Sequence, residues 1–508
     1  MLRIVFLAQQ NLAGKGATYF MTANYLYYGD NLEILRRYIK DETIDLIYLD
    51  PPFNSNQNYN ILFAEQDGSR SAAQIKAFGD TWKWDQGTAR AYEEVVEAGG
   101  KVSQTLQGFR RVLGNSDMLA YLVMIAPRLK ELQRVLKSTG CIYLHCDPTA
   151  SHYLKILMDA IFGPRNLRNE IIWHYKRWPA KTARFQRMHD VILFYGKNKD
   201  LSAFHTLYQE PTASSVKRWR GKKQLVRFDE QGRRLPTQET TESEGVPLDD
   251  VWDVPIIAPS ARERLGYPTQ KPEALLERII RASSNEGDIV LDPFCGCGTA
   301  IAVAQRLDRH WIGIDITSIA INLIKTRLLD TYGESIMQTY KVRGEPTTFS
   351  EARALAEYDK YQFQWWALGL VGARGIEEKK GADAGIDARL YFHDEESGKT
   401  KQVIFSVKGG HTSVKDIRDL RGVIDREEAE IGVLIALQEP TRPMLTEATQ
   451  AGFYESHWGK HSRLQILTIA DLLNEKRVDM PPLKQVNITF KKAPKARNEQ
   501  AQEPELPL

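Results

Sequence analysis

A carboxylate comes directly after a strand-like run of apolar residues at Asp50, in the segment IDLIYLDPPF. Pro51, Pro52 and Phe53 follow it. Proline fixes its own backbone torsion and donates no N–H group, so the two prolines hold the backbone rigidly beside the acid. A simple cap at the end of a strand is the plain alternative. The rigid setting makes Asp50 a candidate catalytic residue.

A glycine-rich turn follows a second strand-like segment, in the sequence DIVLDPFCGCGTAIAVAQRL. Asp292 and Phe294 precede the glycines Gly296 and Gly298, and Thr299 opens a helix-like segment. Glycines let the backbone pass close beneath a ligand, and a helix N-terminus offers free N–H groups. These five residues are therefore candidate ligand-binding residues, although a tight strand-to-helix turn without any ligand has the same pattern.

An acid at the end of the next strand, Asp315, favours a ligand. It stands roughly 20 residues after the turn, where an acid accepts hydrogen bonds from ribose hydroxyls. The phosphate-loop pattern GxxxxGK[ST] is missing, and Ile301 replaces the third glycine of the dinucleotide pattern GxGxxG. A nucleoside without a pyrophosphate fits these residues better, and S-adenosylmethionine is such a ligand.

Strand-like and helix-like segments alternate around both motifs, which predicts an α/β fold with a mostly parallel, Rossmann-like sheet. In open sheets of this kind, ligands bind beyond the carboxyl ends of the strands, at the point where the strand order reverses. Asp50 and the glycine-rich turn both lie at such ends. If their strands are neighbours, the acid faces the ligand held by the turn.

The two motifs, in this order, resemble those of β-class DNA amino-methyltransferases. That family has a DPPY/F/W catalytic motif before its target-recognition region and an FxGxG cofactor motif after it, which is a permuted methyltransferase order. The resemblance covers roughly residues 20–330 and implies S-adenosylmethionine as cofactor. It also assigns cofactor contacts to Thr269 and Lys271 in the segment TQKP, and to Asp30 in YGD.

The resemblance implies a chemistry for Asp50. The amino nitrogen of adenine is a poor nucleophile, because its lone pair is delocalised into the ring. The Asp50 carboxylate and the Pro51 carbonyl would each accept one N–H and free the lone pair, while Phe53 stacks on a base flipped out of the duplex. No Pro-Cys dipeptide is present for attack on carbon-5 of cytosine. In the family an Asp at this position favours adenine N6, and cytosine N4 remains the alternative.

The middle of the chain is rich in Lys, Arg and Trp and is the expected reader of double-stranded DNA. Trp173, Trp178 and Trp219 are more readily explained as core residues than as residues that stack on DNA. The predicted domains are a catalytic domain of residues 20–174 and 263–330, a recognition insert of 175–262, a linker of 331–358, a nuclease-like domain of 359–480 and a disordered tail of 491–508.

The C-terminal α/β unit resembles the Mrr-type branch of PD-(D/E)xK restriction nucleases. Its segment GADAGID contains Asp387, a candidate Mg²⁺ ligand, and a later strand ends on Lys408, a candidate catalytic lysine. Ser406 stands where that branch has Glu or Gln, and Gln364 where it often has Glu. A migrated carboxylate, such as Glu427 or Glu428, is one way to complete the site. Two alternatives stay open: one chain both methylates and cuts DNA, or the chain is a methyltransferase-like DNA-binding module with a non-cleaving C-terminal domain.

Bulk composition agrees with a protein of several domains. The chain has 508 residues, 42% of them hydrophobic and 26% charged, with a net charge of +3, so a polyanion needs local basic surface. Four cysteines are too few for a disulfide framework and are spaced unlike zinc ligands. No membrane partner and a cytoplasmic location are expected. A homodimer and a separate helicase, translocase or restriction subunit stay open as partners.

Overall fold

The computed structural model describes residues 24–52, 59–64, 70–78, 83–178, 181, 183–209, 222–224, 227–228, 231, 233–235, 240–242, 245–267, 269–375, 385–392 and 400–481. Phe53, Trp219 and the tail of residues 491–508 lie outside the described residues. Within the described part of the chain, no helix combines the length and the apolar character that crossing a bilayer requires.

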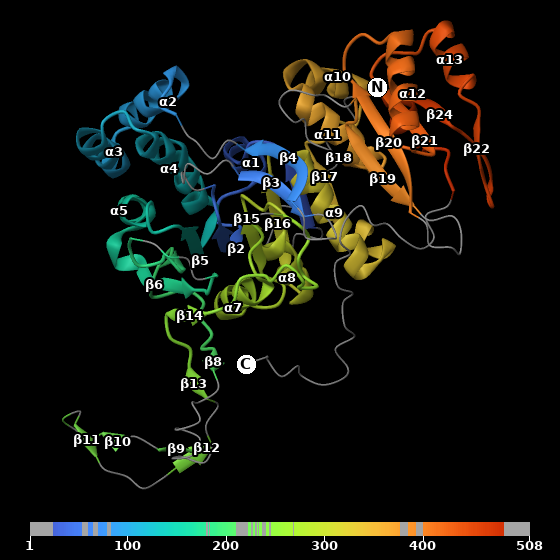
Figure 1. Cartoon of the computed structure of the whole chain (residues 1–508). Helices are drawn as coiled ribbons and strands as arrows, with labels where there is room; N and C mark the ends of the chain where they lie inside the picture. The colour runs from blue at the N-terminus through green and yellow to red at the C-terminus, as the bar shows by residue number, and fades with distance from the viewer. Residues whose placement is uncertain are drawn as a thin grey trace, which may run out of the picture.

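A nine-stranded sheet forms the centre of the larger domain (Figure 1), in the order β14-β6-β7-β5-β2-β15-β16-β1-β17. Only β7 runs antiparallel to its neighbours. The strands are β1 (Asn24–Tyr28), β2 (Ile44–Leu49), β5 (Leu136–Cys146), β6 (Leu167–His174), β7 (His189–Gly196), β14 (Val251–Asp253), β15 (Ile289–Asp292), β16 (His310–Asp315) and β17 (Tyr340–Arg343). The predicted α/β fold with a mostly parallel sheet is confirmed.

Helices cover both faces of this sheet. The helices α1 (Asn31–Tyr38), α4 (Asp117–Val135) and α5 (Ser151–Phe162) share one hydrophobic core, and α2 (Gln86–Glu97) and α3 (Gly100–Leu113) pack on its outer side. The helices α7 (Glu273–Ser283), α8 (Thr299–Arg306) and α9 (Ser318–Tyr332) share the core of the other face. Central strands covered on both sides are expected to be apolar throughout, and every residue of β2 is buried.

The strand order reverses between β2 and β15, which are hydrogen-bonded neighbours, with Leu46 opposite Val290 and Ile47 opposite Leu291. Asp45, a buried acid of β2, accepts a hydrogen bond from the Ile289 amide at 3.0 Å and so helps to fix this register. The chain leaves β2 for one side of the sheet and β15 for the other, which opens a crevice at the carboxyl ends. The expectation that the two motif-bearing strands are neighbours is confirmed.

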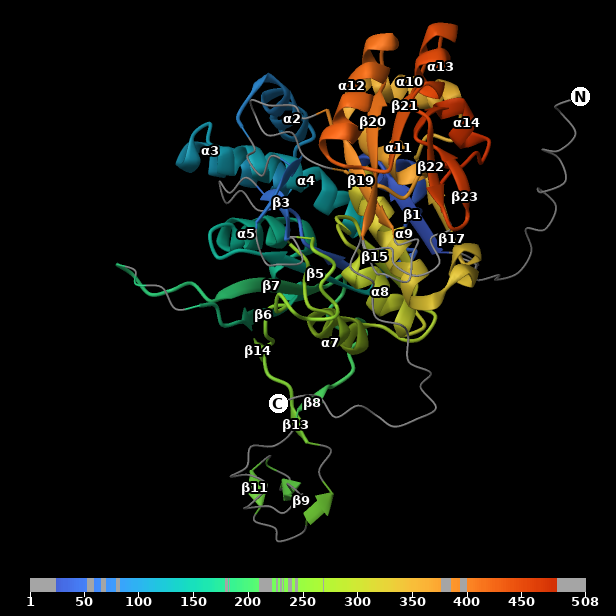
Figure 2. The ribbon, with the colours of Figure 1, turned by 45° about the vertical axis from the view of Figure 1, so that its right-hand side comes forward.

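The recognition insert is smaller than the sequence indicates, because β7 and β14 lie within 175–262 yet belong to the central sheet. Between them, nested antiparallel pairs build an arm that projects from the body in Figures 1 and 2. The pairs are β8 (Tyr208–Gln209) with β13 (Val246–Pro247), β9 (Lys222–Gln224) with β12 (Thr240–Glu242), and β10 (Arg227–Phe228) with β11 (Arg234–Leu235). A separate pair joins β3 (Tyr59–Ala64) and β4 (Arg70–Phe78).

The segment expected as a linker also contributes to the sheet, since β17 is its edge strand beside β1. Trp178 is 95% exposed and is therefore no core residue, whereas Trp173 is buried as expected. Glu427 forms an ion pair with Arg389 at 2.6 Å. Its expected part in a nuclease site stays a prediction.

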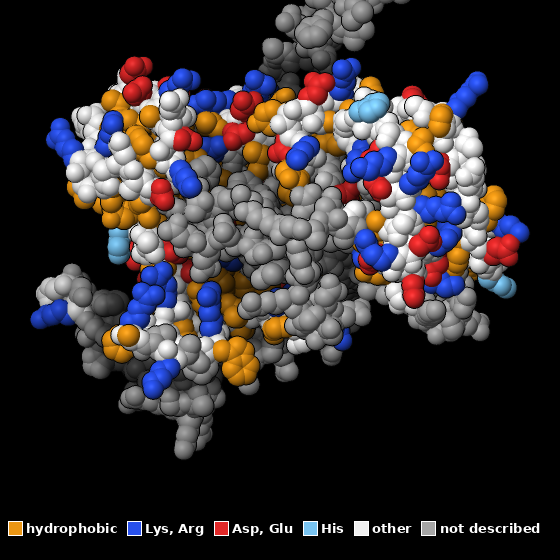
Figure 3. All heavy atoms as spheres, turned by 45° about the horizontal axis from the view of Figure 1, so that its top comes forward, with side chains coloured by type: hydrophobic (Ala, Val, Ile, Leu, Met, Phe, Trp, Pro, Cys, Tyr) orange, Lys and Arg blue, Asp and Glu red, His pale blue; other side chains and the backbone are white. Residues whose placement is uncertain are grey.

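The C-terminal domain has its own five-stranded sheet, in the order β18-β19-β20-β21-β24, with hydrophobic cores on both faces. On the face shown in Figure 3, its Lys and Arg side chains are mixed with Asp and Glu, so that face carries no patch of one sign. Its elements, together with the short helices η1 and η2 of the larger domain, complete the set: η1 (Pro164–Asn166), η2 (Glu334–Gln338), α10 (Phe349–Tyr358), α11 (Lys360–Leu370), β18 (Arg374–Gly375), β19 (Ala388–Phe392), β20 (Lys401–Lys408), α12 (Val414–Arg426), β21 (Ile431–Ala436), α13 (Arg442–Thr449), β22 (Phe453–Ser456), β23 (Gly459–Ser462), β24 (Leu464–Thr468) and α14 (Ile469–Leu473).

Candidate active site

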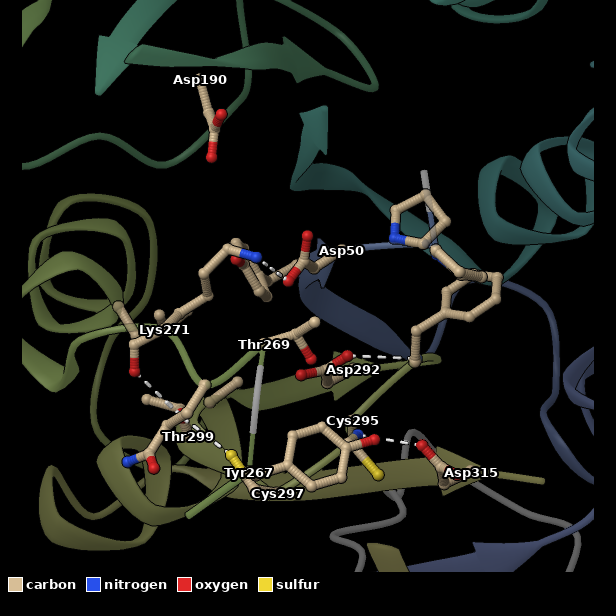
Figure 4. Close-up of a pocket in the computed structure, with 18 of the residues that line it drawn as sticks. Asp50, Asp190, Tyr267, Thr269, Lys271, Asp292, Cys295, Cys297, Thr299 and Asp315 are labelled. Atoms are coloured by element: carbon tan, nitrogen blue, oxygen red, sulfur yellow. Dashed lines mark hydrogen bonds and ion pairs between the residues drawn. The ribbon is translucent and has the colours of Figure 1, made fainter. Parts of the chain in front are cut away.

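Asp50 lies directly after β2 and faces a cavity in the crevice (Figure 4). Its Oδ2 atom forms an ion pair with Lys271 Nζ, and both side chains are largely buried, with 14% and 13% of their surface exposed. Its Oδ1 atom is buried and has no hydrogen-bond partner among the described residues. An unsatisfied buried acceptor costs roughly 1–3 kcal/mol, so this oxygen is poised to accept an N–H group from a ligand.

The glycine-rich turn connects β15 to α8 beneath the same cavity. Gly296 and Gly298 both have positive φ, +49° and +72°, a region that disfavours other residues. A Cβ atom on Gly296 would lie 3.2 Å from the Tyr267 ring, and one on Gly298 would lie 2.7 Å from Ile324 of α9. Gly296 and Thr299 line the cavity, whereas Gly298 is needed for the close packing of α9 against the turn.

Asp315 ends β16 beside this turn and holds its shape. Its Oδ2 accepts the Gly296 amide at 3.0 Å, and its Oδ1 accepts the amide and hydroxyl of Thr317 at 2.9 and 2.7 Å. Burial raises the pKa of Asp315 above the ordinary value of an aspartate, and these hydrogen bonds act in the opposite direction. Each carboxylate oxygen has room for two donors, so Oδ2 keeps one acceptor site for a ligand in the cavity.

Asp292 is the most buried acid of the site, with 4% of its surface exposed. Its Oδ1 accepts the Phe294 amide at 3.1 Å, which fixes the start of the turn. Burial, and after it the charges of Asp50 and Asp315, raise the pKa of Asp292 well above the ordinary aspartate value. The hydrogen bond between Asp292 and Phe294 thus stabilises the turn, and the Asp292 side chain also lines the cavity.

Asp30 lines the cavity from the start of α1, where it acts as the helix cap. Its Oδ1 accepts the Leu32 and Glu33 amides at 2.8 and 3.3 Å, and its Oδ2 pairs with Arg128 at 2.5 Å. Both oxygens of Asp30 therefore have protein partners. Arg128 also donates to Asn31 Oδ1 at 2.6 Å, so this one arginine of α4 holds both Asp30 and Asn31 in place beside the cavity.

The TQKP segment approaches the glycine-rich turn from the other side. Thr269 and Lys271 line the cavity, and the Lys271 carbonyl accepts the Thr299 hydroxyl at 3.2 Å. A buried arginine of α9, Arg327, donates to the Cys297 carbonyl at 3.1 Å and pairs with Glu273 of α7 at 2.6 Å. Arg327 thereby joins the glycine-rich turn to the helix that follows TQKP.

The cavity has a volume of about 740 Å³, enough for a nucleoside-sized ligand and a base side by side. Most of the candidate residues face it: Asp30, Asp50, Pro51, Pro52, Thr269, Lys271, Asp292, Phe294, Gly296, Thr299 and Asp315. These residues belong to five separate segments of the chain, which meet at the carboxyl edge of the sheet.

A second group of side chains lines the part of the cavity beyond Asp50 and Lys271, where Figure 4 shows Asp190 pointing toward them. The Tyr48 hydroxyl lies 3.0 Å from His145 Nδ1, and His145 Nε2 lies 3.2 Å from Asp190. Tyr175 donates its hydroxyl to Asp190 at 3.1 Å. Burial raises the pKa of Tyr175 to about 12, so the hydroxyl stays a donor.

In the C-terminal domain, the antiparallel pairing of β19 and β20 brings Asp387 beside Val407. Asp387 Oδ1 accepts Gln364 Nε2 at 3.0 Å, and Oδ2 accepts the Val407 amide at 2.6 Å. Lys408 is the next residue of β20, and Ser406 is buried. No group of three or more acidic, His or Cys side chains suited to a metal occurs among the residues that the structure describes.

A family model described as DNA methylase matches residues 44–326, which is more than half of the chain. The chain belongs to the DNA methylase family. The type II methyltransferase M.HpaI of Haemophilus parainfluenzae is 30% identical over 260 residues, covering 51% of this chain and 76% of that protein. The DNA adenine methyltransferase YhdJ of Escherichia coli K12 is 28% identical over 342 residues, covering 66% and 94%.

A second family model, described as NACHT-associated inactive restriction endonuclease 1, matches residues 361–474. The larger domain is thus a DNA methyltransferase, and a restriction-endonuclease-like domain follows it in the same chain. Both resemblances proposed from the sequence are confirmed.

Sequence reasoning missed several residues that shape the methylase pocket. Arg128, Tyr267 and Arg327 sit on helices or loops without a motif of their own, so no local signal marks them. Tyr48 and Asp190 show a weak signal, because each stands at or near the end of a core strand. These residues are recognised only when the fold brings them to the cavity.

Proposed function

We propose that this methylase transfers a methyl group from S-adenosylmethionine to the N6 amino group of adenine in double-stranded DNA. The observation that supports this most directly is the Asp50 carboxylate. Lys271 holds one of its oxygens, while the other is buried, without a partner among the described residues, and faces the cavity. Such an oxygen suits the amino group of a base flipped into the pocket.

The residues around the glycine-rich turn fit the cofactor. The free acceptor site of Asp315 suits a ribose hydroxyl, and the glycines leave room for the nucleoside above the turn. The cofactor supplies an electrophilic methyl group on a positively charged sulfur.

Asp50 and the Pro51 carbonyl act on the target amino group in this proposal. Each accepts one N–H, which turns the nitrogen lone pair out of the ring system and toward the methyl group. Asp50 Oδ1 is also placed to take the proton that the nitrogen loses after the new N–C bond forms. Asp50 supports adenine through the family preference, and the similarity to an adenine methyltransferase supports it further; cytosine N4 is the second candidate.

The test is to incubate the protein with radiolabelled S-adenosylmethionine and unmethylated double-stranded DNA, and to digest the DNA to nucleosides. We expect label in N6-methyladenine. Asp50→Ala should abolish incorporation, and the circular dichroism spectrum of the variant should match that of the wild type. Label in N4-methylcytosine would replace the adenine proposal, and no label on any DNA would refute methyl transfer.

For the C-terminal domain we propose a role in a restriction-modification system without DNA cleavage of its own. Its predicted Mg²⁺ ligand, Asp387, already accepts hydrogen bonds on both oxygens. Ser406 stands where the Mrr-type branch has Glu or Gln, and Gln364 where it often has Glu. The similarity to an inactive restriction endonuclease family supports this. Cleavage of unmethylated or methylated DNA in Mg²⁺ by the wild type, lost in Lys408→Ala, would refute it. Light scattering tests the proposed homodimer.

A further inference from the structure

A glutamine of the C-terminal domain lies at the edge of the methylase pocket. Gln362, on the first turn of α11, accepts the Tyr28 hydroxyl at 3.4 Å and the Ser318 amide at 3.3 Å through its Oε1 atom. Ser318 is the first residue of α9, and the first amides of a helix have no partner within the helix. A side chain from another domain therefore satisfies the start of α9.

Both partners of Gln362 are next to residues that face the cavity. Tyr28 ends β1 opposite Asp315 of β16, and the Gly29 amide donates to the Asp315 carbonyl at 2.9 Å. Gly29 and Asp315 line the cavity, and Ser318 follows Thr317, which donates twice to the Asp315 carboxylate. Asp315 is thus connected to each of the two donors of Gln362 by a hydrogen bond to a residue directly next to that donor, and a movement of Asp315 on ligand binding is transmitted along these connections.

The opposite side of α11 holds the centre of the C-terminal domain. Two residues along a helix are about 200° apart around its axis, so Gln362 and Gln364 point in nearly opposite directions. Gln364 donates to Asp387, whose other oxygen accepts the amide of Val407. One helix thus contacts the methylase pocket edge with one glutamine and the Asp387 site with the next.

The helix α11 is packed tightly on both sides, between α9 and the second sheet (Figure 2). A Cβ atom on Gly369 would lie 2.0 Å from the side-chain amide of Asn322 on α9, so the glycine lets that side chain pack directly against the backbone of α11. On the other side, Phe363 and Trp366 are buried in the core of the C-terminal domain. A helix held this closely moves as a unit, because close-packed interiors transmit small shifts.

We propose that Gln362 is a positioning residue for the cofactor end of the methylase pocket, and that α11 couples this pocket to the Asp387 site. The proposal rests on the proposed function, since S-adenosylmethionine is the ligand whose arrival moves Asp315. Coupling between two sites is reciprocal for binding. Disturbing the Asp387 side of α11 therefore changes the affinity of the methylase pocket for its cofactor.

The first experiment separates positioning from folding by steady-state methylation kinetics. Both contacts of Gln362 use Oε1 as an acceptor, so Gln362→Glu keeps them and Gln362→Leu removes them. We expect Gln362→Leu to raise KM for S-adenosylmethionine roughly three- to tenfold, with kcat and KM for DNA near the wild-type values. Gln362→Glu should have a KM for S-adenosylmethionine near that of the wild type. The control is Gln450→Leu, at an exposed residue of the same domain. Equal KM in all four proteins would overturn the positioning role.

The second experiment tests the coupling with a double-mutant cycle on the dissociation constant of S-adenosylmethionine, measured by calorimetry. Gln364→Leu should weaken binding several-fold in the wild-type background and have no effect in the Gln362→Leu background. The same cofactor should slow hydrogen exchange across residues 385–392 and 400–408 of the wild type. If the wild type binds S-adenosylmethionine but Gln364→Leu changes neither binding nor hydrogen exchange, the coupling alone is overturned. If the wild type does not bind S-adenosylmethionine at all, the proposed function is overturned as well as the coupling.

Discussion

The ion pair between Lys271 and Asp50 leads to a prediction that distinguishes two roles for the lysine. The sequence motif assigns Lys271 to the cofactor, but its amine forms an ion pair with the carboxylate of Asp50, the proposed catalytic residue. Replacing it in Lys271→Met keeps the length of the side chain and removes the charge. Asp50 then loses the partner that holds its Oδ2 atom, so the orientation of the carboxylate, and with it the position of Oδ1, is no longer fixed.

The size of the effect follows from the burial of the pair. With 13% and 14% of the two side chains exposed, water screens the interaction little. A hydrogen bond to a charged group contributes roughly 1.5–3 kcal/mol, and about 1.4 kcal/mol changes a rate tenfold. We therefore expect kcat for DNA methylation to fall roughly ten- to hundredfold. KM for S-adenosylmethionine should stay within about twofold, because the Lys271 carbonyl, which remains, makes the contact to Thr299.

The assay is methyl incorporation at saturating and at limiting S-adenosylmethionine, which separates kcat from KM. Lys325→Met is the matched control, since it breaks another ion pair, with Glu345 at 2.5 Å, at residues that do not line the cavity. Unchanged kcat with a large rise in KM for S-adenosylmethionine would refute the reasoning and return Lys271 to the cofactor.

Three further predictions concern stability. Gly298→Ala places a side chain at φ +72° and should lower the free energy of unfolding by roughly 1–3 kcal/mol, whereas Gly287→Ala, at φ +81° with open space around it, should cost less; urea unfolding compares them. Arg327→Met removes the 2.6 Å partner of Glu273, which keeps Arg306 at 3.5 Å, and should cost roughly 1.5–3 kcal/mol, seen as a drop in unfolding temperature. Because burial raises the pKa of Asp292, the folded protein binds that proton more tightly than the unfolded chain, so stability falls as pH rises above about 4. Asp292→Asn should flatten that dependence in urea unfolding across pH, and an unchanged slope would contradict it.

The meeting of Asp50 with the glycine-rich turn was predictable from the sequence. Both motifs end apolar segments, and in a parallel sheet such ends share one edge whatever the loops between them do. The order of strands and helices then leaves few arrangements. The pairing of Leu46 with Val290 realises the arrangement in which the two motifs are adjacent.

The partners of individual side chains were not predictable in the same way. Lys271 and Asp30 carry motif assignments to the cofactor, yet one pairs with Asp50 and the other with Arg128 and two backbone amides. These choices depend on distances of a few ångströms between segments far apart in sequence. Periodicity and spacing hold no such information.

Strands of the central sheet lie inside two segments that the sequence assigns to other regions, for a different reason. Composition suggested an insert wherever Lys, Arg and Trp accumulate, but β7 and β14 lie inside that region as strands of the central sheet. β17, in the expected linker, is a short strand at the edge of the sheet and pairs only with β1. Four residues at an edge give too short a hydrophobic pattern to predict a strand. Tryptophan side chains often lie in a hydrophobic core, but Trp178 is exposed because it lies on a loop beside the pocket.

The central pairing of β2 with β15 has a consequence for biosynthesis. Its contact between Asp45 and Ile289 joins residues 244 positions apart, so the middle of the sheet stays open until most of the methylase region has left the ribosome. Asp50 has no Lys271 partner until that later segment has been synthesised. A nascent chain therefore exposes the unpaired edges of β2 and β15, and we expect the pocket between them to be absent until the two strands pair.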